Sequence, residues 1–68
     1  MQETLGHRIR KLREQRGLNV LQLARGCGHT PGTVKSWEDD KATPRTPSLN
    51  ALRRALGVTA EQLLAGTR

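Results

Sequence analysis

Apolar residues recur along this chain at the three- and four-residue spacing that places them on one face of an α-helix. The first stripe is Leu5, Ile9 and Leu12, and similar stripes follow as far as Leu64. No segment alternates apolar and polar residues in the way that predicts a half-buried β-strand. The pattern therefore predicts an all-α fold of five short helices around one small core. The predicted core residues are Leu5, Ile9, Leu12, Leu18, Leu23, Ala24, Cys27, Val34, Trp37, Leu49, Leu52, Leu56, Val58 and Leu63.

The first two helices are bounded by residues that favour helix ends. After three residues that are expected to fray, a helix is predicted over residues 4–16, with Gly17 as its C-terminal stop. The second helix follows Asn19, a good N-cap that makes a capping-box pattern with Gln22. It ends by Gly28, where the chain must turn sharply and a positive φ is favoured.

The third and fourth helices are predicted to begin with a threonine N-cap followed by proline at the first helical position. These pairs are Thr30-Pro31, which opens a helix over residues 30–38, and Thr46-Pro47. Gly57 ends the fourth helix. The short fifth helix opens with a second capping box, of Thr59 and Gln62, and ends at Gly66.

The length and the cysteine content limit what the chain can be. Its 68 residues predict a single domain with a small core. Cys27 is the only cysteine, which excludes a disulfide framework and is typical of a reducing, intracellular setting. No apolar run is long enough to span a membrane, and no signal-peptide core is recognisable. We therefore expect a soluble, cytoplasmic protein, or a nucleoid-associated one if it comes from a prokaryote.

The charge balance favours a nucleic-acid partner. Lys and Arg total 12 against 6 acidic residues, which gives a net charge of +6 and a pI near 11.2. A positive field of this strength on a small domain is typical of nucleic-acid binding, although charge alone is equally compatible with an ordinary basic surface. Trp37 is the one aromatic residue, so the chain lacks the stacking platforms of common single-strand and RNA-binding modules.

Residues 17–38 predict two short helices joined by a tight turn that contains glycine, which is the pattern of a helix-turn-helix. In DNA-binding proteins the second of these helices lies in the major groove, where its N-terminal residues contact base edges. The N-terminus of the first helix can donate amide hydrogen bonds to a phosphate. Ala24 is small where the two helices must approach, and Val34 is an apolar anchor for the second helix.

A known family pattern matches these elements in order and spacing. The matching residues are Ile9-Arg10-Lys11-Leu12-Arg13, Gly17-Leu18-Asn19, Leu23-Ala24, Gly28, Thr33-Val34-Lys35-Ser36-Trp37-Glu38, Pro47-Ser48-Leu49 and Ala55-Leu56-Gly57-Val58. With them, the chain resembles the phage repressor and Cro family of helix-turn-helix regulators (the Xre-like group) from Leu5 to Leu64. The resemblance implies a lambda-repressor-like fold that binds double-stranded DNA as a homodimeric, repressor-like regulator. It also implies a buried or half-buried ion pair between Arg13 and Glu38.

Four departures from that family alter the expected interface. The family usually has glutamine at the position of Val20, hydrogen-bonding residues at Pro31 and Gly32, and glycine at Asp40. The loop before the fourth helix is also longer than usual and brings in Arg45. Because neither proline nor glycine can form a bidentate hydrogen bond to a base, we expect modest direct readout and a larger share from phosphate contacts and DNA shape. Asp40 and its acidic neighbour are expected to repel DNA locally.

These considerations predict two sets of DNA contacts. The base contacts are assigned to Thr30, Gly32, Thr33, Lys35 and Ser36. The phosphate contacts are assigned to Arg10, Asn19, Gln22, Lys41 and Arg45. Arg8, off the apolar stripe, is expected to be solvated or to face phosphate. Each basic residue in these sets could instead be an ordinary solvated charge.

An alternative function is a protein-interaction or antitoxin-like module that keeps the fold but reads DNA weakly. Val20 and Leu21 are apolar at positions that are usually polar, so they could form such a surface or simply cover the core. If the chain dimerises, the expected dimer surface is the fifth helix and the turn before it, around Val58, Leu63 and Leu64.

Catalytic and metal chemistry find little support in the sequence. Cys27, His29 and His7 offer too few clustered ligands for a structural zinc site, which needs four. We expect Cys27 to lie in the core and His29 to be partly buried. Neither Cys27 nor Ser36 has a recognisable general base, and the glycines fit no phosphate-binding loop. We therefore predict no enzymatic activity, no cofactor, no metal and no small-molecule ligand.

Overall fold

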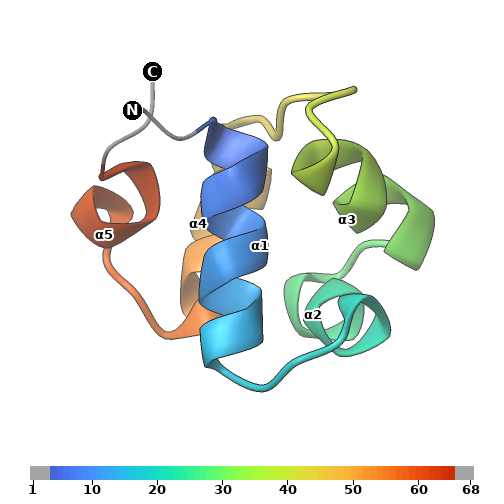
Figure 1. The fold of residues 1–68 in the computed structure, drawn as a ribbon, viewed down its shortest axis with the longest axis horizontal. Coiled ribbons are helices and arrows are strands. Elements are labelled where there is room, and N and C mark those ends of the chain that lie inside the picture. Colours follow the sequence, from blue (N-terminus) through green and yellow to red (C-terminus); the bar gives the residue numbers. More distant parts are fainter. Residues whose placement is uncertain (1–3, 66–68) are drawn as a thin grey trace.

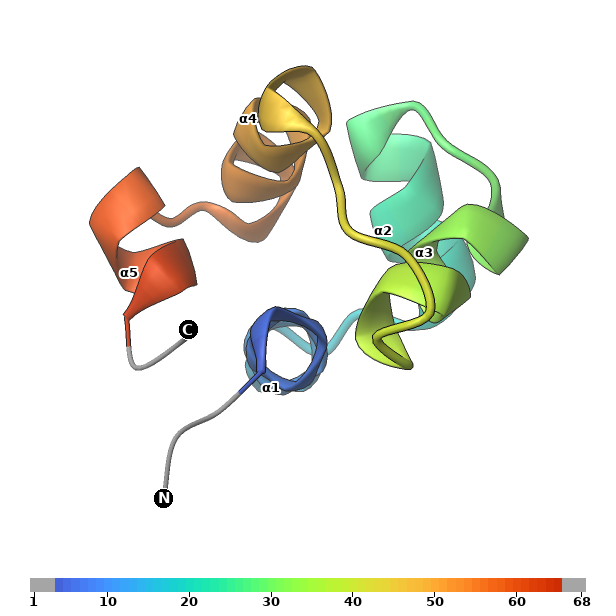
Figure 2. The ribbon, with the colours of Figure 1, turned by 90° about the horizontal axis from the view of Figure 1, so that it is seen from above.

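The computed structural model describes residues 4–65, which form five α-helices. They are α1 (Leu5–Gln15), α2 (Val20–Cys27), α3 (Pro31–Glu38), α4 (Thr46–Leu56) and α5 (Ala60–Leu64). In Figure 1, α1 and α4 lie in the middle, with α5 on one side and the α2–α3 pair on the other. The view along α1 in Figure 2 shows the same division. The predicted all-α fold is confirmed, while the expectations for the first three residues and for Gly66 lie outside the described residues.

Polar side chains cap four of the five described helices, and the predicted caps Asn19, Thr30 and Thr59 are confirmed. Thr4, predicted as the first residue of a helix over 4–16, is instead the N-cap of α1, which ends at Gln15. Thr4, Asn19, Thr30 and Thr59 each accept a hydrogen bond from a backbone N–H in the first turn, and α2 and α5 carry complete capping boxes. The prediction for α4 is wrong by one residue. Arg45 is its N-cap, because the Arg45 carbonyl already accepts from Leu49 N at 2.8 Å, and Thr46 is therefore the first helical residue. No side chain caps this end.

The core lies where the helical stripes meet. Leu5, Leu18 and Leu49, which were also predicted to be core, are half-buried and pack against its edge. The remaining predicted core residues are all buried, namely Ile9, Leu12, Leu23, Ala24, Cys27, Val34, Trp37, Leu52, Leu56, Val58 and Leu63. Within residues 4–65 no helix is long and apolar enough to cross a membrane.

Arginines of α1 connect this helix to its neighbours. Arg8 donates through Nε and Nη2 to the carbonyl of Gln62, at 3.0 and 2.8 Å. Arg16 donates through Nη2 to the carbonyl of Gly57, at 3.3 Å, between α4 and α5. Arg8 was expected to be solvated or to face phosphate; it is half-buried, and two of its nitrogen atoms are bonded to an α5 carbonyl that the sequence did not indicate. Two of the arginine side chains therefore hydrogen-bond within the folded chain.

The turn after α3 is fastened to the N-terminus of α1. Asp40 has a φ of 59°, which non-glycine residues rarely adopt. Its carboxylate accepts from Gly6 N at 3.1 Å and from Thr4 Oγ1 at 2.7 Å, so it satisfies an amide of the first turn of α1. The neighbouring Asp39 lies 3.9 Å from Lys35 Nζ. Each acid thus faces a donor of its own chain, and the expected repulsion of DNA stays a prediction.

Substitutions at Asp40 separate capping from backbone strain. Asp40→Ala is expected to lower the free energy of unfolding by about 1–2 kcal/mol, because the strained backbone stays and the Gly6 amide loses its acceptor. Asp40→Asn is expected to cost less than half as much, because asparagine keeps an acceptor oxygen and tolerates left-handed backbone. Urea denaturation measures both. Equal losses for the two variants would contradict the capping role.

Candidate nucleic-acid interface

A three-residue turn joins α2 to α3. Gly28, at φ 76° and ψ 27°, adopts the left-handed conformation that the sharp turn requires, and glycine does so without steric penalty. The following amide, His29 N, donates to Ala24 O at 2.9 Å and closes the end of α2. Thr30 then caps α3. Ala24 and Val34 are fully buried, which lets the two helices approach closely.

An ion pair between α1 and α3 lies behind the turn. Arg13 Nε and Nη2 donate to Glu38 Oε2 and Oε1, at 2.7 and 3.1 Å. Arg13 Nη1 also donates to Leu18 O at 2.8 Å, just before α2. The side chains are 12% and 6% exposed. The hydrogen bond that Arg13 donates to Glu38 raises the pKa of the Arg13 guanidinium above its ordinary value, so the guanidinium stays charged. One side chain thus fixes α1, α3 and the approach to α2 together.

His29 and Cys27 both serve the fold around the turn. His29 is half-buried, with its Nε2 3.1 Å from Ser48 Oγ on α4 and its ring edge-on to Trp37 at 4.8 Å between centroids. Cys27 is buried in the core, and this burial raises the pKa of its thiol. These positions agree with those expected. Among residues 4–65 no group of three or more His, Cys, Asp or Glu could hold a metal ion.

The predicted base-contacting residues lie along α3 and at its N-cap. Thr30, Gly32 and Lys35 are exposed, whereas Thr33 and Ser36 are half-buried. The Lys35 side chain is 71% exposed, and a Cβ added at Gly32 would meet nothing within 4 Å. The hydroxyls of Thr30 and Thr33 lie 2.9 Å apart. This pairing was not predicted, although two hydroxyl side chains three residues apart at a helix start could have indicated it.

The predicted phosphate-contacting residues are spread over three elements. At the start of α2, the carboxamide oxygens of Asn19 and Gln22 each accept a backbone N–H at 2.8 Å, so only their NH2 groups are left to donate outward. Lys41 and Arg45 are exposed in the connection between α3 and α4. Arg10, on α1, is 60% exposed and lies 3.6 Å from Glu14.

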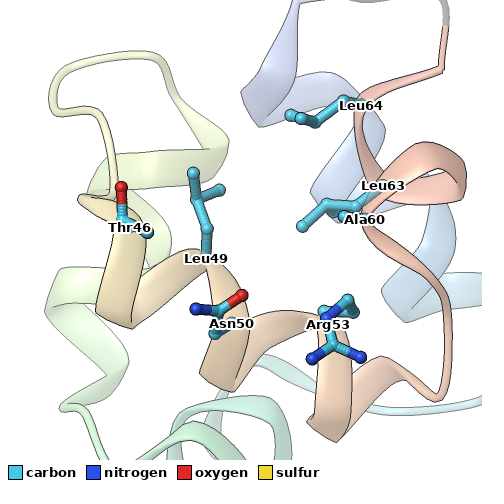
Figure 3. Close-up of a pocket in the computed structure, with 7 residues that line it drawn as sticks. All are labelled: Thr46, Leu49, Asn50, Arg53, Ala60, Leu63 and Leu64. Carbon is cyan, nitrogen blue, oxygen red and sulfur yellow. The ribbon is translucent and has the colours of Figure 1, made fainter.

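A hollow of about 260 Å³ lies between α4 and α5 (Figure 3). Figure 3 shows Leu63 pointing from α5 toward α4, with Arg53 and Asn50 along the α4 side. Leu64 lines the hollow and is 45% exposed. Val58 and Leu63 were expected on a dimer surface, but both are buried because they complete the core. The complete lining is Thr46, Leu49, Asn50, Arg53, Ala60, Leu63 and Leu64.

The two apolar residues at the start of α2 differ in their surroundings. Val20 is half-buried and packs against the core, in agreement with a role in covering it. Leu21 is 43% exposed. Only Leu21 therefore contributes a large apolar group to this surface.

Solved structures with the same fold include DNA-bound regulators. The DNA-binding domain of the P22 c2 repressor, solved by NMR, matches with a TM-score of 0.91 and 27% identity, covering 97% of this chain and 87% of that one. The P22 c2 repressor in complex with synthetic operator 9T matches at 0.86 and 28%, covering 94% and 97%. SinR, a master regulator for biofilm formation, in complex with DNA matches at 0.84 and 27%, covering 90% and 98%.

A further match is a hypothetical transcription factor, NHTF, from Neisseria. Its TM-score is 0.85 at 31% identity, with 91% of this chain and 71% of that one covered. These matches confirm the resemblance to phage repressor-type proteins. In addition, residues 6–68 match the family described as helix-turn-helix domain. Together with the capped α2–turn–α3 unit, this match shows that the chain belongs to the helix-turn-helix domain family.

Proposed function

We propose that this chain is a small transcriptional regulator that binds double-stranded DNA sequence-specifically, with α3 in the major groove. The observation that carries the proposal is the rigid α2–turn–α3 unit, in which Gly28 sets the turn and the Arg13–Glu38 pair fixes α3 from behind. The exposed face of α3 has only short side chains apart from Lys35, which suits close approach to a groove. DNA complexes of P22 c2 repressor and SinR, which share the fold, support it.

The proposed contacts follow from exposure and available donors. Thr30, Gly32, Thr33, Lys35 and Ser36 face base pairs. The NH2 groups of Asn19 and Gln22 and the amides at the start of α2 contact one phosphate. Lys41 and Arg45 contact another through the loop before α4, and Arg10 reaches DNA in competition with Glu14. No catalytic step is part of this function.

The salt dependence of DNA affinity tests this function. About six phosphate contacts predict a log–log slope of affinity against salt near −5. Lys41→Ala and Arg45→Ala are each expected to reduce the magnitude of the slope by about 1 and to weaken all sequences alike. Fluorescence anisotropy with a labelled duplex measures both quantities.

Arg54→Ala is the matched control, because it removes the same charge at a distance from the proposed contact. Arg54 lies nine residues after Arg45, which is about 13.5 Å along α4 at a rise of about 1.5 Å per residue. The variant is expected to leave the slope within about 0.3 of the unaltered protein. A flat salt response, or no binding at low salt, would reject DNA binding and favour a protein-interaction module. That alternative draws on the exposed Leu21 and on SinR, which has also been solved with the SinI protein.

The bound form is proposed to be a homodimer in which α5 and the hollow beside it meet a second copy. The exposed Leu64 next to an apolar hollow supports this choice of surface. One helix-turn-helix covers a short half-site, and dimers reach two half-sites about 34 Å apart. The longest extent of the protein is 29 Å. If two copies meet at the side away from α3, their two α3 helices can therefore lie as far apart as two half-sites do.

Leu64→Lys is expected to weaken dimerisation at least about tenfold, because a charge replaces an apolar contact of about 1.5 kcal/mol or more. Sedimentation equilibrium measures the dimer, and a duplex with two half-sites should lose affinity while a single half-site should not. Leu21→Lys changes the other exposed leucine and should leave the oligomeric state unaltered. If both variants sediment like the unaltered protein, the α5 surface is not the dimer contact.

A further inference from the structure

The chain leaves α3 through a tight turn that fixes where Lys41 begins. Asp40 N donates to Trp37 O at 3.2 Å, and Lys41 N donates to Ser36 O at 2.9 Å. Together with the positive φ of Asp40, these two bonds form the Schellman arrangement that ends many helices. The backbone at Asp40 therefore sets the direction in which Lys41 and the loop before α4 leave α3.

The backbone conformation does not explain why this position holds an aspartate. Glycine adopts a positive φ without steric penalty, and it is the residue that most often ends helices in this way. What Asp40 adds is a carboxylate, which accepts from Gly6 N at 3.1 Å and from Thr4 Oγ1 at 2.7 Å. Figures 1 and 2 both show the end of α3 beside the first turn of α1. The carboxylate thus ties the turn to residues that lie 34 and 36 positions earlier in the chain.

Lys41 directly follows this tie, and its side chain is available to DNA. It is exposed, and within residues 4–65 no acidic side chain pairs with it. The Asp40 carboxylate is bonded instead at the N-terminal end of α1, where the helix dipole favours a negative charge. A phosphate contact helps to fix how a protein lies on the duplex. For Lys41 to make one while α3 lies in the groove, the loop must hold it at a set place relative to α3.

Given the proposed function, on which this inference rests, we propose that Asp40 is a positioning residue for DNA binding, which holds Lys41 within reach of its phosphate by tying the end of α3 to α1. The tie and the phosphate contact are then coupled, because each holds the loop in the conformation that the other needs. By reciprocity, the factor that the tie adds to DNA affinity is also the factor that bound DNA adds to the stability of the tie. An acidic residue thus contributes to DNA binding through its hydrogen bonds.

Two substitutions at Asp40 isolate the tie. Asp40→Asn and Asp40→Gly both remove the charge and both tolerate left-handed backbone, but only asparagine keeps an oxygen that can accept from Gly6 N. With a duplex selected from a random pool, at about 0.1 M salt, we expect Asp40→Gly to bind about fivefold more weakly than Asp40→Asn. The log–log slope of affinity against salt should also be smaller in magnitude by about 0.5–1, since one phosphate contact contributes about 0.9. Fluorescence anisotropy measures both, and circular dichroism confirms that both variants are folded.

A matched pair of variants at Asp39 controls for the flexibility that glycine brings. Asp39→Asn and Asp39→Gly remove the same charge one residue earlier, where the side chain lies 3.9 Å from Lys35 and makes no described bond to α1. These two variants should differ from each other in affinity by less than about twofold. A difference as large as that at Asp40 would show that glycine itself weakens binding, and it would overturn the positioning role.

The effect of the tie should depend on Lys41. In protein that also carries Lys41→Ala, Asp40→Asn and Asp40→Gly should bind DNA with equal affinity, because the contact that the tie positions is already gone. If the difference between them persists undiminished in this background, Asp40 does not act through Lys41 and the proposal is wrong.

Hydrogen exchange of the unaltered protein tests the coupling without any substitution. On a duplex with a single half-site, exchange of the Gly6 amide should slow by about fivefold, the same factor as the affinity difference between the Asp40 variants. The Gly57 amide is the control, because it also belongs to a glycine and donates to Arg54 O, 3.2 Å away, at the far end of α4. Equal slowing of the two amides would indicate general stabilisation of the fold and would overturn the coupling.

The failure of this inference is distinct from the failure of the proposed function. Selective DNA binding with equal affinity for Asp40→Asn and Asp40→Gly overturns the positioning role and leaves the proposed function intact. An absence of selective DNA binding by the unaltered protein overturns the proposed function, and the positioning role with it.

Discussion

Glu38→Ala is expected to lower the free energy of unfolding by about 3–5 kcal/mol, the usual cost of removing one member of a buried ion pair. The substitution leaves the Arg13 guanidinium, which is 12% exposed, with only the Leu18 carbonyl as a described acceptor. A desolvated positive charge without its counter-charge is costly, and arginine cannot lower this cost by releasing its proton, because it does not deprotonate at accessible pH. The loss would also release α3 from α1, so DNA binding should fall with stability.

The loss expected for Glu38→Ala is large relative to the total free energy of unfolding. A chain of this length is stable by about 3–10 kcal/mol, so the variant loses much or all of its folded population at room temperature. Urea titration at low temperature, together with thermal melting, gives the difference. Glu14→Ala is the control, since its partner Arg10 lies 3.6 Å away and both side chains are more than half exposed. That surface pair should contribute less than about 0.5 kcal/mol.

A second variant separates the charge from the packing. Arg13→Met with Glu38→Leu removes both charges and keeps apolar bulk, and it should recover most of the stability that Glu38→Ala loses. A melting temperature near that of the unaltered protein for Glu38→Ala alone would show that the pair contributes nothing to stability. Poor recovery in the double variant would show that its geometry, more than its charge, fixes α3 to α1.

Local signals made the secondary structure predictable. The capping box of Asn19 with Gln22 forms as its spacing indicates, and so does the left-handed Gly28 at the end of α2. These devices act within a few residues, so the sequence alone contains both partners. The errors of this kind are of one residue at helix ends. At Thr46 the error arose because a threonine before proline can either cap a helix or begin it, and at Thr4 the threonine caps the helix that it was predicted to begin.

Contacts between residues far apart in the chain were not predictable. The Arg8–Gln62 hydrogen bond, the Asp40–Gly6 cap and the His29–Ser48 contact depend on how complete helices are placed. Charge and polarity alone indicated an Arg8 that is solvated or faces phosphate and an Asp40 that repels DNA. Neither interpretation could include a partner that only the folded chain brings near. Only the Arg13–Glu38 pair could be named beforehand, because the family resemblance supplied it.

The elements that hold the candidate site were predictable, but the state of their polar groups was not. The helix-turn-helix pattern indicated α2, α3 and the turn between them, because these follow from turn chemistry and apolar spacing. The donors that remain available on Thr30 and Gln22 depend on internal hydrogen bonds. Exposure likewise separates Leu64 from the buried Leu63, although both are leucines of α5.

Gly6→Ala is expected to destabilise the protein by about 1–3 kcal/mol or more, against the direction that helix propensity predicts. From the sequence, Gly6 only weakens the first turn of α1, so alanine should improve it by about 1 kcal/mol. In the fold, however, Gly6 is buried where α1 meets the end of α3. A Cβ there would overlap the carbonyl oxygen of Trp37 and lie 2.7 Å from both Glu38 O and Asp40 Oδ1.

Two of these three atoms are backbone oxygens of α3, so relief requires the helix itself to move. Gly32→Ala is the matched control, because a Cβ at that helical glycine meets nothing within 4 Å. It should stabilise the protein by up to about 1 kcal/mol in the same urea titration. If Gly6→Ala proves as stable as Gly32→Ala, α1 and α3 can separate at little cost. The close approach of the two helices would then not be what positions α3, and the Arg13–Glu38 pair would carry that role alone.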